Sequence, residues 1–133
     1  MKQTNNITFY SYLHPHMCVG GLLNFEKDYA LQRLTKNEQI IFEQVNPTIS
    51  RLATHTSGAY LEFQTTSSFI EIKVDLTHGS YLPHMSAIAQ AGFCLYYFDD
   101  GRWIFLASSK VDQKNYIYRM IESLSNTLKT FRL

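Results

Sequence analysis

The sequence lacks any uninterrupted apolar run of about 18 residues, the length that a membrane-spanning helix needs. The first residues, MKQTNNITFY, have no apolar segment after the lysine, unlike a secretory signal. We therefore expect a cytoplasmic protein that does not contact membranes. The formal net charge is only +1, and so weak a charge gives no electrostatic reason to bind nucleic acid.

Proline, glycine and cysteine are also scarce, with three, six and two residues respectively. No low-complexity linker or internal repeat divides the 133 residues, so they fit one domain. We expect a partly ordered N-terminal segment over residues 1–18 and a folded domain over residues 19–133. Cys18 and Cys94 lie far apart, and in a cytoplasmic chain we expect both to stay reduced.

Motifs of nucleophilic catalysis are missing as well. The chain has neither a Gly-x-Ser-x-Gly elbow nor a Gly-Asp-Ser block. Ser80 lies between His78 and His84, but two flanking histidines do not make a catalytic triad. Cys94 lies inside a predicted strand with no basic neighbour to activate its thiol. We expect Cys94 and Cys18 to be small buried side chains.

The best candidates for metal ligands are His14 and His16, because residues two apart in a strand share a face. No Cys, Asp or Glu follows at ligand spacing. We therefore expect an exposed N-terminal segment here rather than a metal site, and the sequence indicates no cofactor.

What the chain does have is a series of short apolar segments with a period of two. Such segments cover residues 59–65, 67–76, 93–98, 102–108 and 127–133. The polar residues 65–68 predict a hairpin turn between the first two segments. Asp99-Asp100-Gly101 predicts a tight hairpin between the next two. Residues 116–120 fit either a strand or the start of a helix.

These segments predict an all-β fold, a jelly-roll-like antiparallel β-sandwich with room for one short helix. Before Asn46 the pattern mixes helical and strand spacing. Residues 77–92 form a loop that is too long for a tight hairpin. Such loops often carry recognition or a domain contact, although packing against the sandwich would explain this one equally well.

Several segments, in order, resemble one family. They are residues 19–35, His55-Thr56-Ser57-Gly58, residues 61–74, residues 83–92 and residues 92–103. This series is similar to the N-terminal β-sandwich domain that precedes the catalytic domain in a group of GDSL/SGNH hydrolases. The Gly-x-Asp-Leu-Tyr signature of that domain corresponds to Gly92-Phe93-Cys94-Leu95-Tyr96, with Cys94 in place of the Asp. Thr35 replaces the Pro of the family's Arg-Leu-Pro segment.

The family's nucleophile, oxyanion-hole and catalytic-histidine blocks are all missing from these 133 residues. The resemblance therefore implies a non-catalytic domain of an esterase or acyl-transfer enzyme. Such a domain packs on the SGNH catalytic domain and helps to shape its acyl-substrate cleft. We expect the contact at loop 77–91, where Tyr81 and Met85 would supply adaptable apolar surface and His84 a polar anchor.

Two other functions stay open at this point. The first is a stand-alone carbohydrate-binding module in which Trp103, Tyr97 and Tyr60 form a platform for a glycan. The same rings would also suit a core or a domain interface. The second is a homodimer, in which an apolar surface without its partner domain pairs with a second copy.

Overall fold

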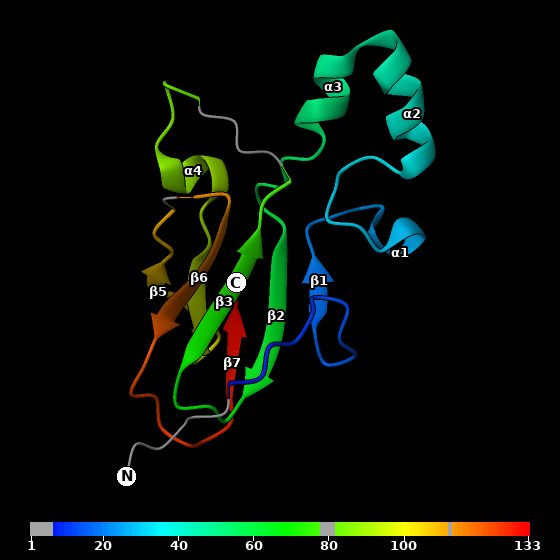
Figure 1. Cartoon of the computed structure of the whole chain (residues 1–133). Coiled ribbons are helices and arrows are strands. Elements are labelled where there is room, and N and C mark those ends of the chain that lie inside the picture. Colours follow the sequence, from blue (N-terminus) through cyan, green and yellow to red (C-terminus); the bar gives the residue numbers. More distant parts are fainter. Residues whose placement is uncertain (1–6, 78–81, 112) are drawn as a thin grey trace.

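The computed structural model describes residues 7–77, 82–111 and 113–133, and within them the chain forms seven strands and four short helices (Figure 1). The strands are β1 (Cys18–Gly20), β2 (Tyr60–Thr65), β3 (Ile70–Asp75), β4 (Cys94–Asp99), β5 (Arg102–Ser108), β6 (Asn115–Ile121) and β7 (Lys129–Arg132). They make a five-stranded sheet in the order β1-β2-β7-β4-β5 and a two-stranded sheet of β3 and β6. All pairs are antiparallel. The prediction of a single antiparallel β-sandwich is therefore confirmed, while its jelly-roll connectivity stays a prediction.

The core lies between the two sheets. Leu95 of β4 and Phe131 of β7 are fully buried, and they cluster with Ile72 of β3 in the other sheet. The ring of Phe63 stacks on that of Phe131, with centroids 5.9 Å apart. Because burial of each such side chain contributes about 1.5–3 kcal/mol, this cluster holds the two sheets together.

The hairpin of β4 and β5 forms where the sequence predicts it. Asp99 pairs with Arg102, and the two residues between them have positive φ, 43° at Asp100 and 75° at Gly101. Two positive φ angles are typical of a type I′ turn, whose twist matches that of the paired strands. The Asp-Gly signal therefore fixes the hairpin and its register as far as Tyr96, beyond which the register shifts by one residue.

The predicted hairpin turn at residues 65–68 is wrong, because β2 and β3 belong to different sheets. Both strands bury one face in the same core, so they lie opposite each other across the sandwich instead of pairing. The Ser67 hydroxyl donates to the carbonyl oxygen of Phe69 at 2.7 Å, and the Ser67 N–H donates to Thr65 Oγ1 at 3.0 Å. These local bonds satisfy backbone groups where the chain leaves one sheet for the other.

The structure decides between strand and helix for residues 116–120, and it shows how far the two cysteines are buried. Residues 115–121 are strand β6 and not a helix, since Tyr116 and Met120 are buried while Ile117 between them is exposed. Both cysteines are free thiols; Cys94 is partly buried, but Cys18 is exposed. The expectation of a buried Cys18 was wrong because Cys18 begins β1, an edge strand.

The chain has more helix than the one short element expected. The helices are α1 (Phe25–Asp28), α2 (Lys36–Val45), α3 (Pro47–Leu52) and α4 (Ala87–Ala91). Helix α2 begins with a capping box: Thr35 Oγ1 accepts from the N–H of Glu38, and the Thr35 N–H donates to Glu38 Oε2. Thr35 thus performs a capping role that a proline could not. Within the described residues, no helix has the length and apolar character to cross a membrane.

Candidate functional site

The outer face of the five-stranded sheet, which is the face turned away from the core, carries a row of stacked side chains. The guanidinium of Arg132 lies over the ring of Tyr60 at 4.0 Å and over the ring of Trp103 at 4.1 Å. Its Nη2 also donates to Glu62 Oε2 at 2.9 Å. Each contact of a cation with an aromatic face contributes about 0.5–1 kcal/mol at exposed sites, so the row ties three strands together on this face.

A glycine makes room for this row. Gly20 of β1 lies directly opposite Tyr60 in the register of the two strands. A Cβ atom at Gly20 would lie 2.2 Å from Cζ of Tyr60, far inside contact distance. The ring of Tyr60 therefore covers the Gly20 backbone on one side and Arg132 on the other.

Further aromatic rings lie next to this row. Phe98 contacts Trp103, with ring centroids 5.0 Å apart, and Tyr96 contacts Phe105 at 5.7 Å. Phe98 and Phe105 are 42% and 55% exposed. The outer face thus presents apolar rings beside Trp103, whose own ring already has Arg132 over one face.

Of the three rings considered for a glycan platform, the structure brings together only two. Trp103 and Tyr60 meet through Arg132 on the outer face. Tyr97 points to the opposite face, where its ring lies 5.7 Å from that of Phe131 and packs on the core. Strand alternation separates Tyr97 from the other two.

The segment before β4 is held in shape by Gln90. Its side-chain Nε2 donates to the carbonyl oxygens of Leu82 (3.0 Å) and Met85 (2.7 Å), and its Oε1 accepts from the N–H of Leu82 (2.7 Å). His84 and Met85 are consequently presented to the outside, and both are exposed. Tyr81 and Ser80 lie outside the described residues. Sequence reasoning missed Gln90, because nothing in its pattern distinguishes a glutamine that folds a loop from a solvated one.

The signature stretch that begins at Gly92 has a structural explanation. A Cβ atom at Gly92 would lie 2.7 Å from the backbone of Ile88, so only glycine lets the chain turn from α4 into β4 this closely. Leu95 is fully buried in the core, and Tyr96 joins the outer face. Cys94, at the position of the family's Asp, is partly buried at the start of β4.

Arg33 joins two of the segments that resemble the family, residues 19–35 and residues 55–58. Its Nε donates to the carbonyl oxygen of His55 at 3.0 Å, and its Nη2 donates to that of Ser57 at 2.6 Å. Its backbone N–H also donates to the carbonyl oxygen of Ala53. The residues around Arg33 and residues 55–58, far apart in sequence, are therefore held together at the end of the sandwich near the start of β2.

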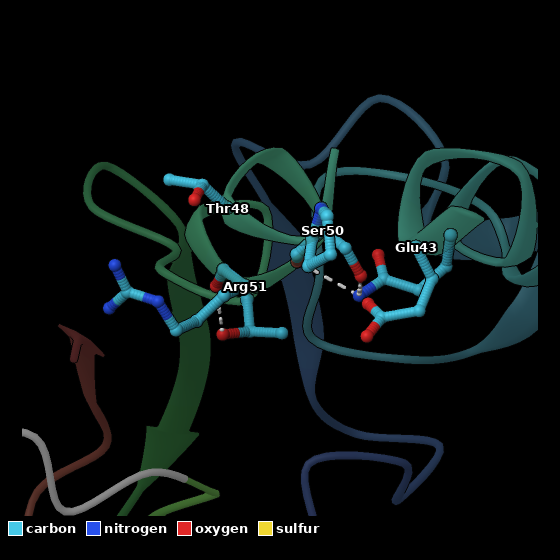
Figure 2. A pocket seen from close by; sticks show the side chains of 7 residues that line it. Glu43, Thr48, Ser50 and Arg51 are labelled. Atoms are coloured by element: carbon cyan, nitrogen blue, oxygen red, sulfur yellow. Dashed lines mark hydrogen bonds between the residues drawn. The ribbon is translucent and has the colours of Figure 1, made fainter. Parts of the chain in front are cut away.

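A groove of about 380 Å³ lies between α2 and α3, and Figure 2 shows the side chains that line it. It is lined by Gln39, Glu43, Pro47, Thr48, Ser50, Arg51 and Thr54. The amide of Gln39 donates to Ser50 Oγ at 2.8 Å and to the Ser50 carbonyl oxygen at 2.9 Å. The Ser50 hydroxyl is buried and accepts from this amide, and no histidine lines the groove.

Potential metal ligands and potential nucleophiles are the remaining side chains of interest in the described part of the chain. No three His, Cys, Asp or Glu residues within it lie close enough together to hold a metal ion. The rings of His14 and His16 are 5.2 Å apart, and the His16 N–H donates to Nδ1 of His14. None of the described serine and cysteine side chains is hydrogen-bonded to a histidine.

Comparison with known proteins gives two matches. A family model described as the N-terminus of an SGNH-hydrolase-type esterase, with the GxDLY signature, matches residues 7–133. The solved structure of a GDSL-like lipase from Bacteroides ovatus ATCC 8483 is similar to this chain, with a TM-score of 0.76 and 22% identity. The match covers 88% of this chain and 34% of that lipase chain, so the likeness is one of fold over about a third of the lipase. No curated protein matches the chain.

Proposed function

Because the chain belongs to the family of N-terminal domains of SGNH-hydrolase-type esterases, we propose that it packs on an SGNH catalytic domain and helps to shape that domain's substrate cleft. The observation that carries the proposal is the position of three segments that resemble the family, residues 19–35, 55–58 and 83–92. The connection between α3 and β2, to which Arg33 is bonded, and helix α4, which Gly92 follows directly, lie at the upper end of the sandwich in Figure 1. Loops presented at one end of a rigid scaffold often carry binding residues.

The C-terminal residue supports the same location for the partner. Leu133 exchanges two backbone hydrogen bonds of 2.9 Å with Leu61, the second residue of β2. A catalytic domain joined after Leu133 would start beside Tyr60, at the end of the sandwich that carries α4.

At this end, the exposed His84 and Met85 are the residues that we propose for the contact. The sequence adds Tyr81 to the proposal, although Tyr81 lies outside the described residues. Methionine adapts its shape to the opposing surface, and a histidine adds a polar anchor. The hydrogen bonds of Gln90 hold the backbone of residues 82 and 85 in place, which limits the entropy lost on contact. In this proposal the acyl chemistry belongs to the catalytic domain.

The test compares the isolated chain with the native polypeptide that carries it, using p-nitrophenyl esters as substrates. We expect hydrolysis by the polypeptide with an SGNH domain and only background hydrolysis by the chain alone. His84→Ala and Met85→Ala in the longer polypeptide should raise KM for the ester. Hydrolysis by the chain alone that disappears in Ser80→Ala would overturn the non-catalytic assignment.

A second candidate is carbohydrate binding at the outer face, favoured by the exposed rings of Phe98 and Phe105 beside Trp103. A sugar ring would stack on these exposed rings. Glycan-array binding that is lost in Phe105→Ala and in Trp103→Ala would support it. The absence of any glycan binding would contradict this candidate.

A further inference from the structure

Helices α2 and α3, which we call the helical arm (residues 36–52), make little contact with the sandwich. Neither helix packs extensively on any strand, α2 buries no residue, and α3 buries only Ser50. Figure 1 shows the arm standing off to one side of the sandwich's upper end. Isolated helices of 10 and 6 residues are not stable in water, so the arm depends on the packing of α2 against α3 and on its tethers to the neighbouring chain.

The arm also exposes apolar side chains. Val45 is 76% exposed and Ile41 is 59% exposed, and because they are four residues apart they share one face of α2. On α3, Ile49 and Leu52 are exposed as well. Monomeric domains rarely leave such groups uncovered, and apolar patches of this kind mark protein contacts.

The arm is nevertheless held in a defined place. Gln39 of α2 donates twice to Ser50 of α3, and Arg33, two residues before the N-cap of α2, bonds to the carbonyl oxygens of His55 and Ser57. A tethered arm with apolar side chains exposed fits a preformed docking element, since little order is lost on contact.

We propose that the helical arm docks on the SGNH catalytic domain, with Ile41 and Val45 at the centre of the contact. This inference rests on the proposed function, which supplies the partner. The similar lipase chain extends far beyond the third that this fold matches, so a partner domain on the same chain has ample length to cover the arm. Leu133 beside Leu61 would start that domain at the same end of the sandwich as the arm. The exposed rings of the outer face differ from the arm in that they contact one another and Arg132.

The experiment is hydrogen–deuterium exchange of the isolated chain and of the native polypeptide that contains its SGNH domain. Amides of residues 36–52 should exchange about tenfold or more slowly in the longer polypeptide. Combining Ile41→Lys with Val45→Lys should abolish this protection, because lysine keeps helix propensity while a buried charge opposes docking. The matched control is Ile117→Lys on β6, where the replaced isoleucine is also 59% exposed; it should leave the protection intact.

The possible failures are distinguishable. A native polypeptide without an SGNH domain would overturn the proposed function and this inference with it. An SGNH domain that is present while residues 36–52 exchange as fast as in the isolated chain would overturn only the docking of the arm. Protection that appears in the isolated chain as its concentration rises would assign the arm to a second copy, and would also overturn the inference.

Discussion

The guanidinium of Arg33 donates to the carbonyl oxygen of Ser57 across 24 residues of sequence, with Nη2 and O 2.6 Å apart. Its Nε bonds to His55 in the same way. Both acceptors lie in the connection between α3 and β2, so one side chain positions the chain on either side of the helical arm.

Arg33→Ala should therefore destabilise the fold by about 1–2 kcal/mol, since it leaves two carbonyl oxygens without their charged donor. Arg33→Lys should recover only part of this loss, because an ammonium cannot reproduce the fork of a guanidinium. Urea unfolding followed by circular dichroism measures both. Arg51→Ala, at an exposed arginine of α3, is the control and should change stability by less than about 0.5 kcal/mol. Equal losses of unfolding free energy in Arg33→Ala and Arg51→Ala would show that the hydrogen bonds of Arg33 to His55 and Ser57 do not stabilise the fold.

Gly20→Ala should cost about 1–3 kcal/mol, because the new methyl group overlaps the ring of Tyr60 and forces it away from Arg132. The same change in a Tyr60→Ala background should cost much less. Thermal or urea unfolding of the four proteins in this cycle gives the coupling. Additive effects would show that the contact of Gly20 with Tyr60 is not what requires the glycine.

The stability of α2 should depend on pH through Glu38. Hydrogen bonds from Thr35, with its backbone N–H first and its hydroxyl second, lower the pKa of Glu38 below the usual 4.5. Because the folded pKa is the lower one, the stabilisation is complete above the unfolded value and is lost as the pH falls through the folded value. Glu38→Gln should therefore flatten the fall in stability below about pH 4.5.

Urea unfolding at a series of acidic pH values provides the measurement. Glu43→Gln, at an exposed glutamate of the same helix, is the control and should retain the slope of the unaltered chain. A Glu38→Gln protein with an unchanged acid slope would show that the capping box does not contribute to it.

Gly101→Ala should destabilise the β4–β5 hairpin by about 1 kcal/mol, because an L-residue at φ 75° carries a steric cost that glycine avoids. Asp100→Asn is the control; asparagine also accepts positive φ, so stability should stay nearly unchanged. The free energy of unfolding of both variants tests the turn. A tolerated alanine would mean that the turn relaxes to another type.

The strands and the Asp-Gly hairpin could be predicted because their signals are local. Alternation in residues 70–75 and the residue types of the turn need no knowledge of distant neighbours. The pairing of β2 could not be predicted from its sequence neighbour β3, because its real partners, β1 and β7, are both distant in sequence, and β7 lies more than 60 residues away. Loop length alone does not distinguish a hairpin from a change of sheet.

The helices before Asn46 escaped prediction for a different reason. Their apolar side chains, such as Ile40 and Ile41, do not form one buried stripe, because these residues are exposed in the fold. The capping box of Thr35 and Glu38 was the available signal, since Thr-x-x-Glu marks a helix start. The row of Tyr60, Arg132 and Trp103 depends on three strands meeting, and no spacing along the chain encodes that.

The position of β7 has a consequence for synthesis. This strand, at residues 129–132, lies between β2 and β4 in the middle of the five-stranded sheet. Until it leaves the ribosome, the β1–β2 pair and the β4–β5 hairpin have no neighbour to join them, and Phe131 is missing from the core. The nascent domain must therefore wait for almost its last residues before it folds, and any translational pause before residue 129 leaves two incomplete half-sheets exposed.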